Sequence, residues 1–169
     1  QALQLSEAQR DHLRSKRYIT MCVTPDWPPY ETINQRGRHV GMIADAMDLM
    51  ADRIGAPIRV IPTETWSRSL EFARQRMCDI VSAVQRTPAR EEYLDFTEPY
   101  LSFPYVIAVR SDEMFVEDLE QLAGKRVGVV EDYAVEDILR RGHPELQSVP
   151  VDSVAQGLRK VSSGELFGF

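Results

Sequence analysis

Hydrophobic and polar residues along this chain follow two periodicities in turn. Short apolar runs between turn residues predict strands at 18–24, 58–61, 78–84, 104–110 and 126–130. Apolar residues spaced three and four apart predict helices at 3–15, 42–54, 66–76, 116–124, 133–141 and 153–162. Strands that alternate with helices in this way indicate parallel βαβ units, and hence the α/β class.

Turn and capping residues support several of these boundaries. Asn34–Gly37 reads as a turn, and Gly55 is suited to end the helix before it in a left-handed conformation. Ser153 is a favoured N-cap, and Gly164 follows the last predicted helix. The α/β pattern restarts after a break near 101–103, which predicts two lobes.

We therefore divide the chain into three parts. Residues 1–17 are predicted to form an N-terminal helix or linker. Residues 18–101 are predicted to form the first lobe, and residues 102–169 an incomplete second lobe.

Composition narrows the functional classes. The chain has 169 residues, 43% hydrophobic and 27% charged, and its net charge of −6 argues against nucleic acid as a partner. No apolar run approaches the roughly 18 residues that span a membrane. The first residues lack the apolar region of a signal peptide, so targeting signals do not assign a compartment.

The two cysteines, Cys22 and Cys78, allow two interpretations. Neither belongs to a CxxC motif or a Cys/His cluster, so we expect no zinc and no other metal. The first interpretation is two buried, reduced thiols, because both residues fall on predicted strands and free cysteine is commonly buried. The alternative is a disulfide, which would imply an oxidising compartment.

The segment from Cys78 to Tyr100 carries the strongest chemical signal. After the strand, Thr87 is a natural N-cap and Pro88 suits the first helical position. Arg90 follows in that turn, beside helix N-terminal amides that favour a bound carboxylate. The alternative is a surface ion pair between Arg90 and Glu91 or Asp95, which would contribute little.

This segment, CDIVSAVQRTPAREEYLDFTEPY, resembles the signature of the family 3 bacterial extracellular solute-binding proteins. The segments CVTPDWPPYE, RMCDI and VDSVAQGLRKVSSGE resemble the family's sensor domains in histidine kinases and diguanylate cyclases. The resemblance implies a periplasmic-binding-protein-like, type II Venus flytrap of two α/β lobes. It also implies that the second lobe and the return to the first lobe are truncated in this chain.

The resemblance assigns roles to six positions. Arg90 would grip a ligand carboxylate, while Trp27 and Trp66 would wall the pocket. The remaining positions would add hydrogen bonds or close the pocket from the second lobe: Ala83, Gln85 and Tyr133. Gln85 replaces the usual hydroxyl residue, and Asp132 places an acid at a turn that commonly binds anions. From the residues alone, Trp27 could instead pack on its own lobe and Trp66 could belong to a core stripe.

These observations predict a periplasmic ligand-sensing domain of a bacterial membrane signalling protein. It would bind an amino acid or a related carboxylate between its lobes, without a cofactor. A transporter-associated amino-acid-binding protein is the alternative. An enzyme on this fold, dehydratase-like or regulating a lytic enzyme, is less favoured because His12, His39 and His143 are scattered and no catalytic set stands out. Unpaired sheet edges would also allow a homodimer.

Overall fold

The computed structural model describes residues 3–169, and the chain divides into two compact units. Unit 1 comprises the residues up to Gln85 together with Glu92–Leu94. Unit 2 comprises Arg86–Glu91 and Asp95–Phe169. The first two residues of the predicted segment 1–17 lie outside the described residues. Arg86–Glu91 group with unit 2, whereas the sequence analysis placed them in the first lobe; the lobe boundary at residue 101 stays a prediction.

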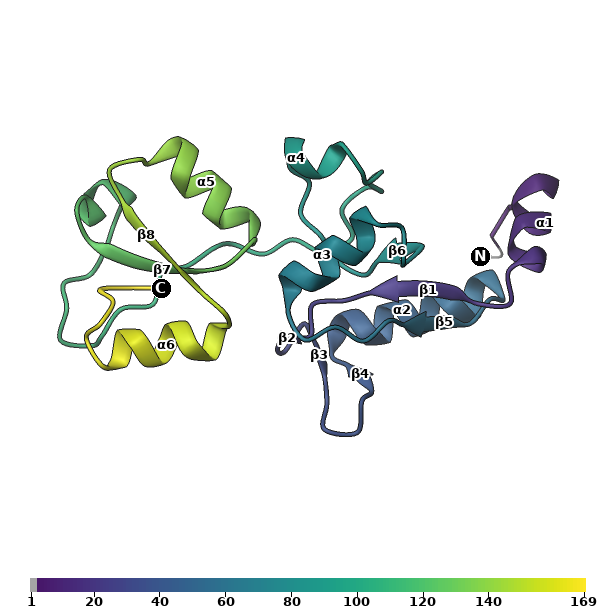
Figure 1. Cartoon of the computed structure of the whole chain (residues 1–169), viewed down its shortest axis with the longest axis horizontal. Helices are drawn as coiled ribbons and strands as arrows, with labels where there is room; N and C mark the ends of the chain where they lie inside the picture. Colours follow the sequence, from purple (N-terminus) through teal and green to yellow (C-terminus); the bar gives the residue numbers. More distant parts are fainter. Residues whose placement is uncertain (1–2) are drawn as a thin grey trace. The chain divides into compact units, whose positions relative to one another are not determined.

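Unit 1 is built on a three-stranded parallel sheet (Figure 1). Its strand order is β5-β1-β6, with β1 at Ile19–Cys22, β5 at Ile58–Val60 and β6 at Ile80–Val81. Met21 is the Cα partner of both Val60 and Ile80, so β1 is the central strand. All three strands are shorter than the apolar runs that predicted them.

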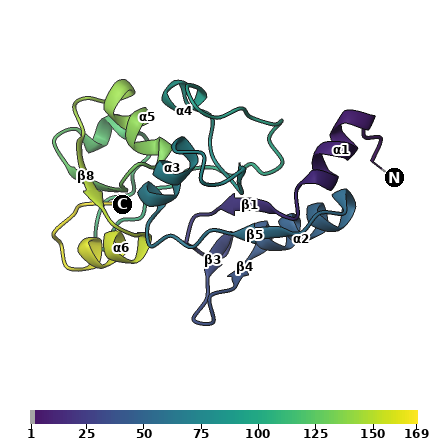
Figure 2. The same cartoon turned by 45° about the vertical axis from the view of Figure 1, so that its right-hand side comes forward.

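Three helices belong to unit 1: α1 (Glu7–Ser15), α2 (Met42–Ile54) and α3 (Trp66–Arg74). A capping box between Ser6 and Gln9 begins α1. The predicted role of Gly55 is confirmed, since it ends α2 with a φ of 67°. In two views α2 runs beside β5, and α3 packs on β1 (Figures 1 and 2).

A second small sheet lies between β1 and α2 in the chain. Strands β2 (Asp26–Trp27), β3 (Glu31–Ile33) and β4 (His39–Val40) pair in antiparallel order. The predicted turn at Asn34–Gly37 joins β3 to β4, and Gly37 donates to the Asn34 carbonyl over 2.8 Å. None of these three short strands was predicted from the sequence.

A disulfide joins Cys22 to Cys78, so the disulfide interpretation of the two cysteines applies. Their Cα atoms lie 5.8 Å apart, and both side chains pack with Ala73 of α3. Cys22 ends β1, but Cys78 lies in the turn before β6 and not on a strand as predicted. The bridge therefore ties the central strand to the entry of its neighbour.

Unit 2 contains a two-stranded parallel sheet, β7 (Arg126–Val130) with β8 (Gln147–Val151). Helices α5 (Ala134–Gly142) and α6 (Val154–Ser162) lie on opposite sides of it (Figure 1). Ser153 caps α6, as predicted, by accepting from the amide of Gln156. Strand β8 was not predicted from the sequence, and it contains Pro150. This strand pairs with β7, and an edge strand tolerates proline.

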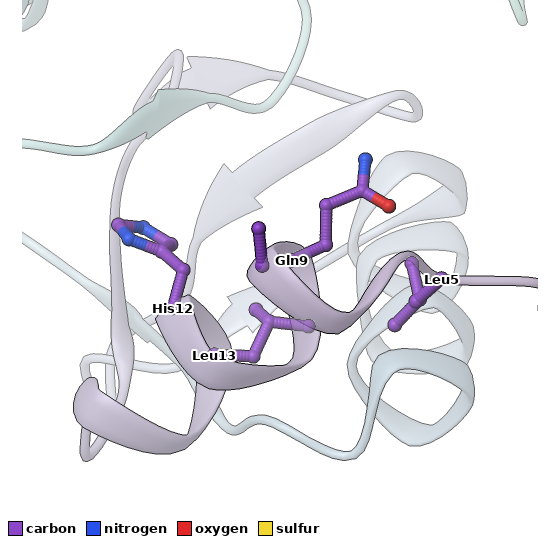
Figure 3. Close-up of a pocket in the computed structure, with 5 residues that line it drawn as sticks. Leu5, Gln9, His12 and Leu13 are labelled. Atoms are coloured by element: carbon purple, nitrogen blue, oxygen red, sulfur yellow. The ribbon is translucent and has the colours of Figure 1, made fainter.

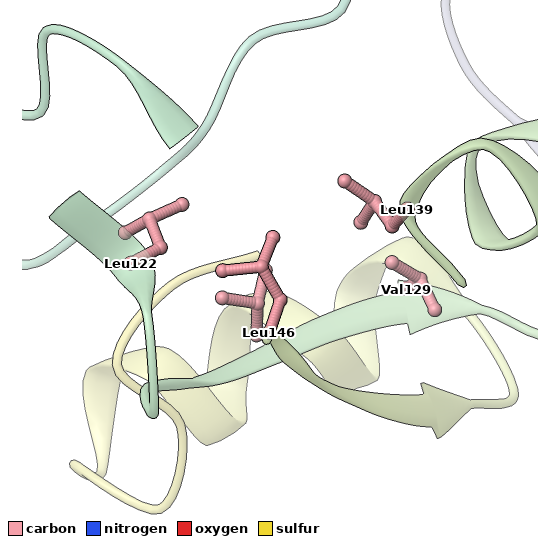
Figure 4. Close-up of a cluster of buried hydrophobic side chains, with 5 residues drawn as sticks. Leu122, Val129, Leu139 and Leu146 are labelled. Atoms are coloured by element: carbon pink, nitrogen blue, oxygen red, sulfur yellow. The ribbon is translucent and has the colours of Figure 1, made fainter. Parts of the chain in front are cut away.

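Alternating valines of β7 supply both faces of the unit 2 core. Val127 and Val129 pack with Leu122, Leu139 and Leu146 on the α5 side (Figure 4). Val130 joins the α6 side, where the cluster also contains Val151, Val161 and Leu166. Because core clusters lie on both sides of β7, its residues after the exposed Arg126 are all buried.

Two predictions for unit 2, one helix and one strand, were wrong. The predicted helix 116–124 is only a 3-10 turn, η1 (Leu119–Leu122), because the chain turns at Gly124 (φ 71°) to enter β7. The predicted strand 104–110 makes a single bridge, Val109 with Gly168. Ala108 and Phe169 exchange hydrogen bonds of 2.8 and 2.9 Å, which is too little pairing for a strand.

Candidate ligand-binding site

In unit 1 the predicted site residues follow three adjacent parallel strands. Trp27 comes after β1, Trp66 after β5, and Ala83 after β6. Because β5, β1 and β6 are parallel neighbours, their carboxyl ends meet at one edge of the sheet. Ligands of open α/β sheets bind at that edge. The topology therefore places the segments that carry these three predicted positions after the same edge of the sheet.

Trp27 lies on β2, half-buried, opposite Glu31 of β3. Its ring centroid is 4.7 Å from that of Tyr30, with the two planes tilted by 41°. The Pro25 carbonyl accepts hydrogen bonds from the Ile33 amide and the Thr32 hydroxyl, each over 2.9 Å. We call residues 25–30, which carry Trp27 and Tyr30, the aromatic loop. It is held by strand pairing as well as by its three prolines.

Trp66 begins α3 directly after its N-cap, Thr65, whose hydroxyl accepts from the Arg68 amide. Only 7% of Trp66 is exposed. Ser69, one turn later, is fully buried and donates to the Val23 carbonyl over 2.7 Å, which fixes α3 against the end of β1. This burial is what a core stripe requires, and the pocket-wall role of Trp66 stays a prediction.

Ala83 and Gln85 follow β6 in a segment without regular structure. Ala83 is half-buried and Gln85 is exposed. The preceding residue, Ser82, is buried and donates its hydroxyl to Glu31 over 2.7 Å. Their predicted contributions to carboxylate binding stay predictions.

Arg90 lies in unit 2 on a single helical turn, α4 (Pro88–Glu91). The Thr87 carbonyl accepts from the amides of Arg90 and Glu91, each over 3.0 Å. Arg90 is 7% exposed, and its Nη2 donates to the Asp132 carbonyl oxygen over 2.7 Å. Such burial distinguishes Arg90 from a surface arginine, and the Glu91 carboxylate pairs instead with Arg86, 3.7 Å away.

The turn after β7 presents that carbonyl. Asp132 has a φ of 60°, and its amide donates to the Glu136 carboxylate over 3.0 Å. Tyr133 follows as the half-buried N-cap residue of α5. The backbone of this turn thus contacts Arg90 through the Asp132 carbonyl oxygen.

Sequence reasoning missed two residues near these positions. Burial raises the pKa of Tyr105, and the positive charge of Arg90 partly offsets that rise, so the phenol lies near the guanidinium. The second is Glu31, which is fully buried beside the aromatic loop. No periodic signal marks either residue, since one lies outside regular structure and the other in a three-residue strand.

A pocket elsewhere in unit 1 contains none of the predicted residues (Figure 3). It is lined from α1 and the residues before it: Leu5, Ala8, Gln9, His12 and Leu13. The side chain of Gln9 is engaged in the helix cap. Within residues 3–169, acidic, histidine and cysteine side chains form no group of three suited to a metal ion. Over the same residues, no helix combines the length and apolar character that crossing a bilayer requires.

Comparison with known structures defines the class of fold. The periplasmic VFT2 domain of Bordetella pertussis BvgS superimposes with a TM-score of 0.85 at 22% identity. The match covers 98% of this chain and 70% of that domain. The protein therefore has the α/β, periplasmic-binding-protein-like Venus flytrap fold, of which this chain spans part.

Residues 19–163 match the bacterial extracellular solute-binding proteins, family 3, and the chain belongs to this family. It is 27% identical over 147 residues to the virulence sensor protein BvgS of Bordetella pertussis. It is 23% identical over 151 residues to the ABC transporter arginine-binding protein 1 of Escherichia coli K12. A cyclohexadienyl dehydratase of Pseudomonas aeruginosa is 25% identical over 122 residues.

The extent of these matches differs. They cover 87% of this chain for BvgS, 89% for the arginine-binding protein and 72% for the dehydratase. They cover only 12%, 61% and 46% of those relatives, respectively. The chain thus spans a small part of the sensor relative and over half of the transport relative.

Proposed function

We propose that this chain is a ligand-sensing domain of a bacterial membrane signalling protein, and that it binds an amino acid or a related carboxylate. Arg90 carries the proposal. Its guanidinium is buried, and one of its N–H groups is oriented by the Asp132 carbonyl. A guanidinium has five donors in a rigid fork that matches a carboxylate.

The remaining predicted residues receive supporting roles. Trp27 and Trp66 wall the ligand, Ala83 and Gln85 add hydrogen bonds, and Tyr133 contributes from the turn after β7. Domains of this fold class respond to ligands by hinge closure. A ligand with higher affinity for the closed state shifts the population toward it, and that shift is the signal.

Sensor relatives support the signalling role, and their periplasmic domains support a periplasmic location. The disulfide supports the same compartment, because disulfides persist in oxidising environments. We place the domain outside the inner membrane, attached to a signalling module on the other side.

A transporter-associated binding protein is the second candidate. It is favoured by the likeness to an arginine-binding protein, of which the chain covers more than it does of the sensor. Both candidates use the same ligand chemistry and differ in what the ligated state contacts. The length of the parent protein would separate them.

We propose binding without turnover, although a dehydratase is among the relatives. An enzyme requires an acid or base in contact with its substrate. Glu31 is fully buried and is hydrogen-bonded to the half-buried His39 over 2.9 Å, so its carboxylate is not open to a substrate. A signal of product formation from any compound that binds would contradict this part of the proposal.

The test is thermal unfolding of the purified protein with each of the twenty amino acids and with small dicarboxylates. A compound that binds only the folded state stabilises it by about 2.7 kcal/mol at about 100 times its Kd. We expect at least one such shift in the wild type and its loss in Arg90→Ala. Arg140→Ala is the matched control, because Arg140 is an exposed arginine of α5 paired with Asp137.

A shift that survives Arg90→Ala would contradict the role of Arg90. An unchanged unfolding temperature with every compound would contradict the amino-acid proposal while leaving the fold assignment intact. The homodimer suggested by unpaired sheet edges is tested separately by sedimentation. A strict monomer at high concentration would contradict it.

A further inference from the structure

A buried carboxylate ties together the parts of unit 1 that carry predicted ligand residues. Glu31 is fully buried, yet three polar groups reach it. Its Oε1 accepts from the Thr24 amide over 2.8 Å, and its Oε2 accepts from the Ser82 hydroxyl over 2.7 Å. The His39 Nε2 lies 2.9 Å from the same Oε2.

These partners come from different segments. Thr24 lies between β1 and β2, where the aromatic loop begins, and Ser82 lies between β6 and Ala83. His39 belongs to β4, which closes the small antiparallel sheet. One side chain therefore connects the segments after two parallel strands with the hairpin beside them.

Glu31 is also the direct cross-strand partner of Trp27. Strands β2 and β3 are two and three residues long, so backbone pairing alone gives the aromatic loop few hydrogen bonds. Hydrogen bonds to a charged group contribute more than neutral ones, and a buried donor left without its partner is costly. Trp27 thus lies opposite a residue whose side chain is hydrogen-bonded to Thr24, Ser82 and His39.

We propose that Glu31 is a positioning residue for the ligand site, an inference that rests on the proposed function. Its carboxylate sets the geometry of the Trp27 loop and of the Ser82–Ala83 segment relative to each other, and so sets ligand affinity without touching the ligand. His39 and Ser82 are the side chains through which it acts.

The experiment reads Trp27 directly and needs no ligand. The protein has two tryptophans, so 5-fluorotryptophan labelling gives two fluorine resonances, which Trp66→Phe assigns. We compare wild type, Glu31→Gln and Ser82→Ala. Glu31→Gln keeps the shape of the side chain but removes its charge and one acceptor.

Ser69→Ala is the matched control. Ser69 is buried like Ser82 and donates over the same 2.7 Å, but its acceptor is the Val23 carbonyl. It lies on α3 with Trp66. A purely structural loss should therefore affect this variant as much as Ser82→Ala.

We expect Glu31→Gln and Ser82→Ala to move or broaden the Trp27 resonance while the Trp66 resonance stays native. Ser69→Ala should leave the Trp27 resonance in place. A Trp27 resonance that does not move in folded Glu31→Gln would overturn the inference, as would an equal response to Ser69→Ala. Should Glu31→Gln fail to fold, Ser82→Ala decides alone.

A second arm uses L-arginine as the probe in calorimetric titration. We expect Glu31→Gln to weaken its binding about tenfold, and Ser69→Ala to leave it within about twofold. Unchanged affinity in Glu31→Gln would overturn the inference. If wild type does not bind L-arginine, that amino acid is not a ligand of the proposed site, and the fluorine spectra still decide whether Glu31 positions Trp27.

Discussion

Both units bury apolar side chains, but the interactions that stand out in each unit differ. Unit 1 combines a disulfide with a fully buried, hydrogen-bonded glutamate. Unit 2 relies on interlocking valine and leucine side chains on both faces of one strand pair. Unit 1 thus adds a covalent bond and a buried polar group to its apolar packing.

Strand length explains this difference. In unit 2, β7 and β8 pair over five residues, so backbone pairing and side-chain packing reinforce each other. In unit 1, β6 pairs with β1 over only two residues. Residues beyond such short strands are poorly fixed by a sheet, and the disulfide and Glu31 supply the missing restraint where predicted ligand residues lie.

The largest expected effect is removal of the disulfide. Cys22 and Cys78 are separated by 56 residues, and the chain-entropy estimate for a loop of that size is about 4 kcal/mol. We expect Cys22→Ala/Cys78→Ala to lower the free energy of unfolding of unit 1 by about that amount. Hydrogen exchange resolved by residue would measure it, with unit 2 as the internal control.

An equal loss of protection in unit 2 would break the comparison, because it would mean that the two units unfold as one. Reductant should destabilise the wild type and have no effect on the double variant. A wild type that is indifferent to reductant would contradict a stabilising role for the bridge.

The second effect is a cavity in the unit 2 core. Leu122, the last residue of η1, is completely buried and packs with Val127 and Val129 of β7 (Figure 4). Replacing such a leucine by alanine removes packing and leaves a cavity, so Leu122→Ala should cost about 3 kcal/mol. Urea unfolding would give the value. Leu158→Ala, at an exposed position of α6, is the control and should cost well under about 1 kcal/mol.

The smallest effect concerns Asp79, beside the disulfide. Burial raises the pKa of Asp79, but hydrogen bonds from Lys16 and Thr20 outweigh it and hold the pKa below the ordinary value of 3.8. A depressed folded-state pKa gives stability that is present above pH 3.8 and is lost as the pH falls through the folded-state value.

Asp79→Asn should therefore cost about 1 kcal/mol at pH 7, since the group is partly solvated. The difference from wild type should shrink as the pH is lowered below 3.8, which urea unfolding at a series of pH values would follow. Asp112→Asn is the control, because Asp112 forms an exposed pair with Arg110 in unit 2. A pH-independent difference for Asp79→Asn would contradict the electrostatic explanation.

Local signals in the sequence were enough for the class of fold and most helices. Ser153 and Gly55 mark helix ends because each pairs with a backbone group within one turn. The Ser153 side chain accepts from the Gln156 amide, and the Gly55 amide donates to the Ala51 carbonyl. The motif around Arg90 was enough to indicate the family, since its residues are close together in the chain. The ligand roles of these residues are still predictions.

Features that depend on residues far apart in the sequence could be assigned only from the tertiary structure. The sequence left the state of Cys22 and Cys78 open, because 56 residues separate them and pairing depends on where β1 and the turn before β6 meet. It did not single out Glu31, whose partner Ser82 lies 51 residues away. The apolar run at 104–110 predicted a strand, but the structure has only one bridge there. An apolar run becomes a strand only where a neighbouring strand supplies a ladder of hydrogen bonds.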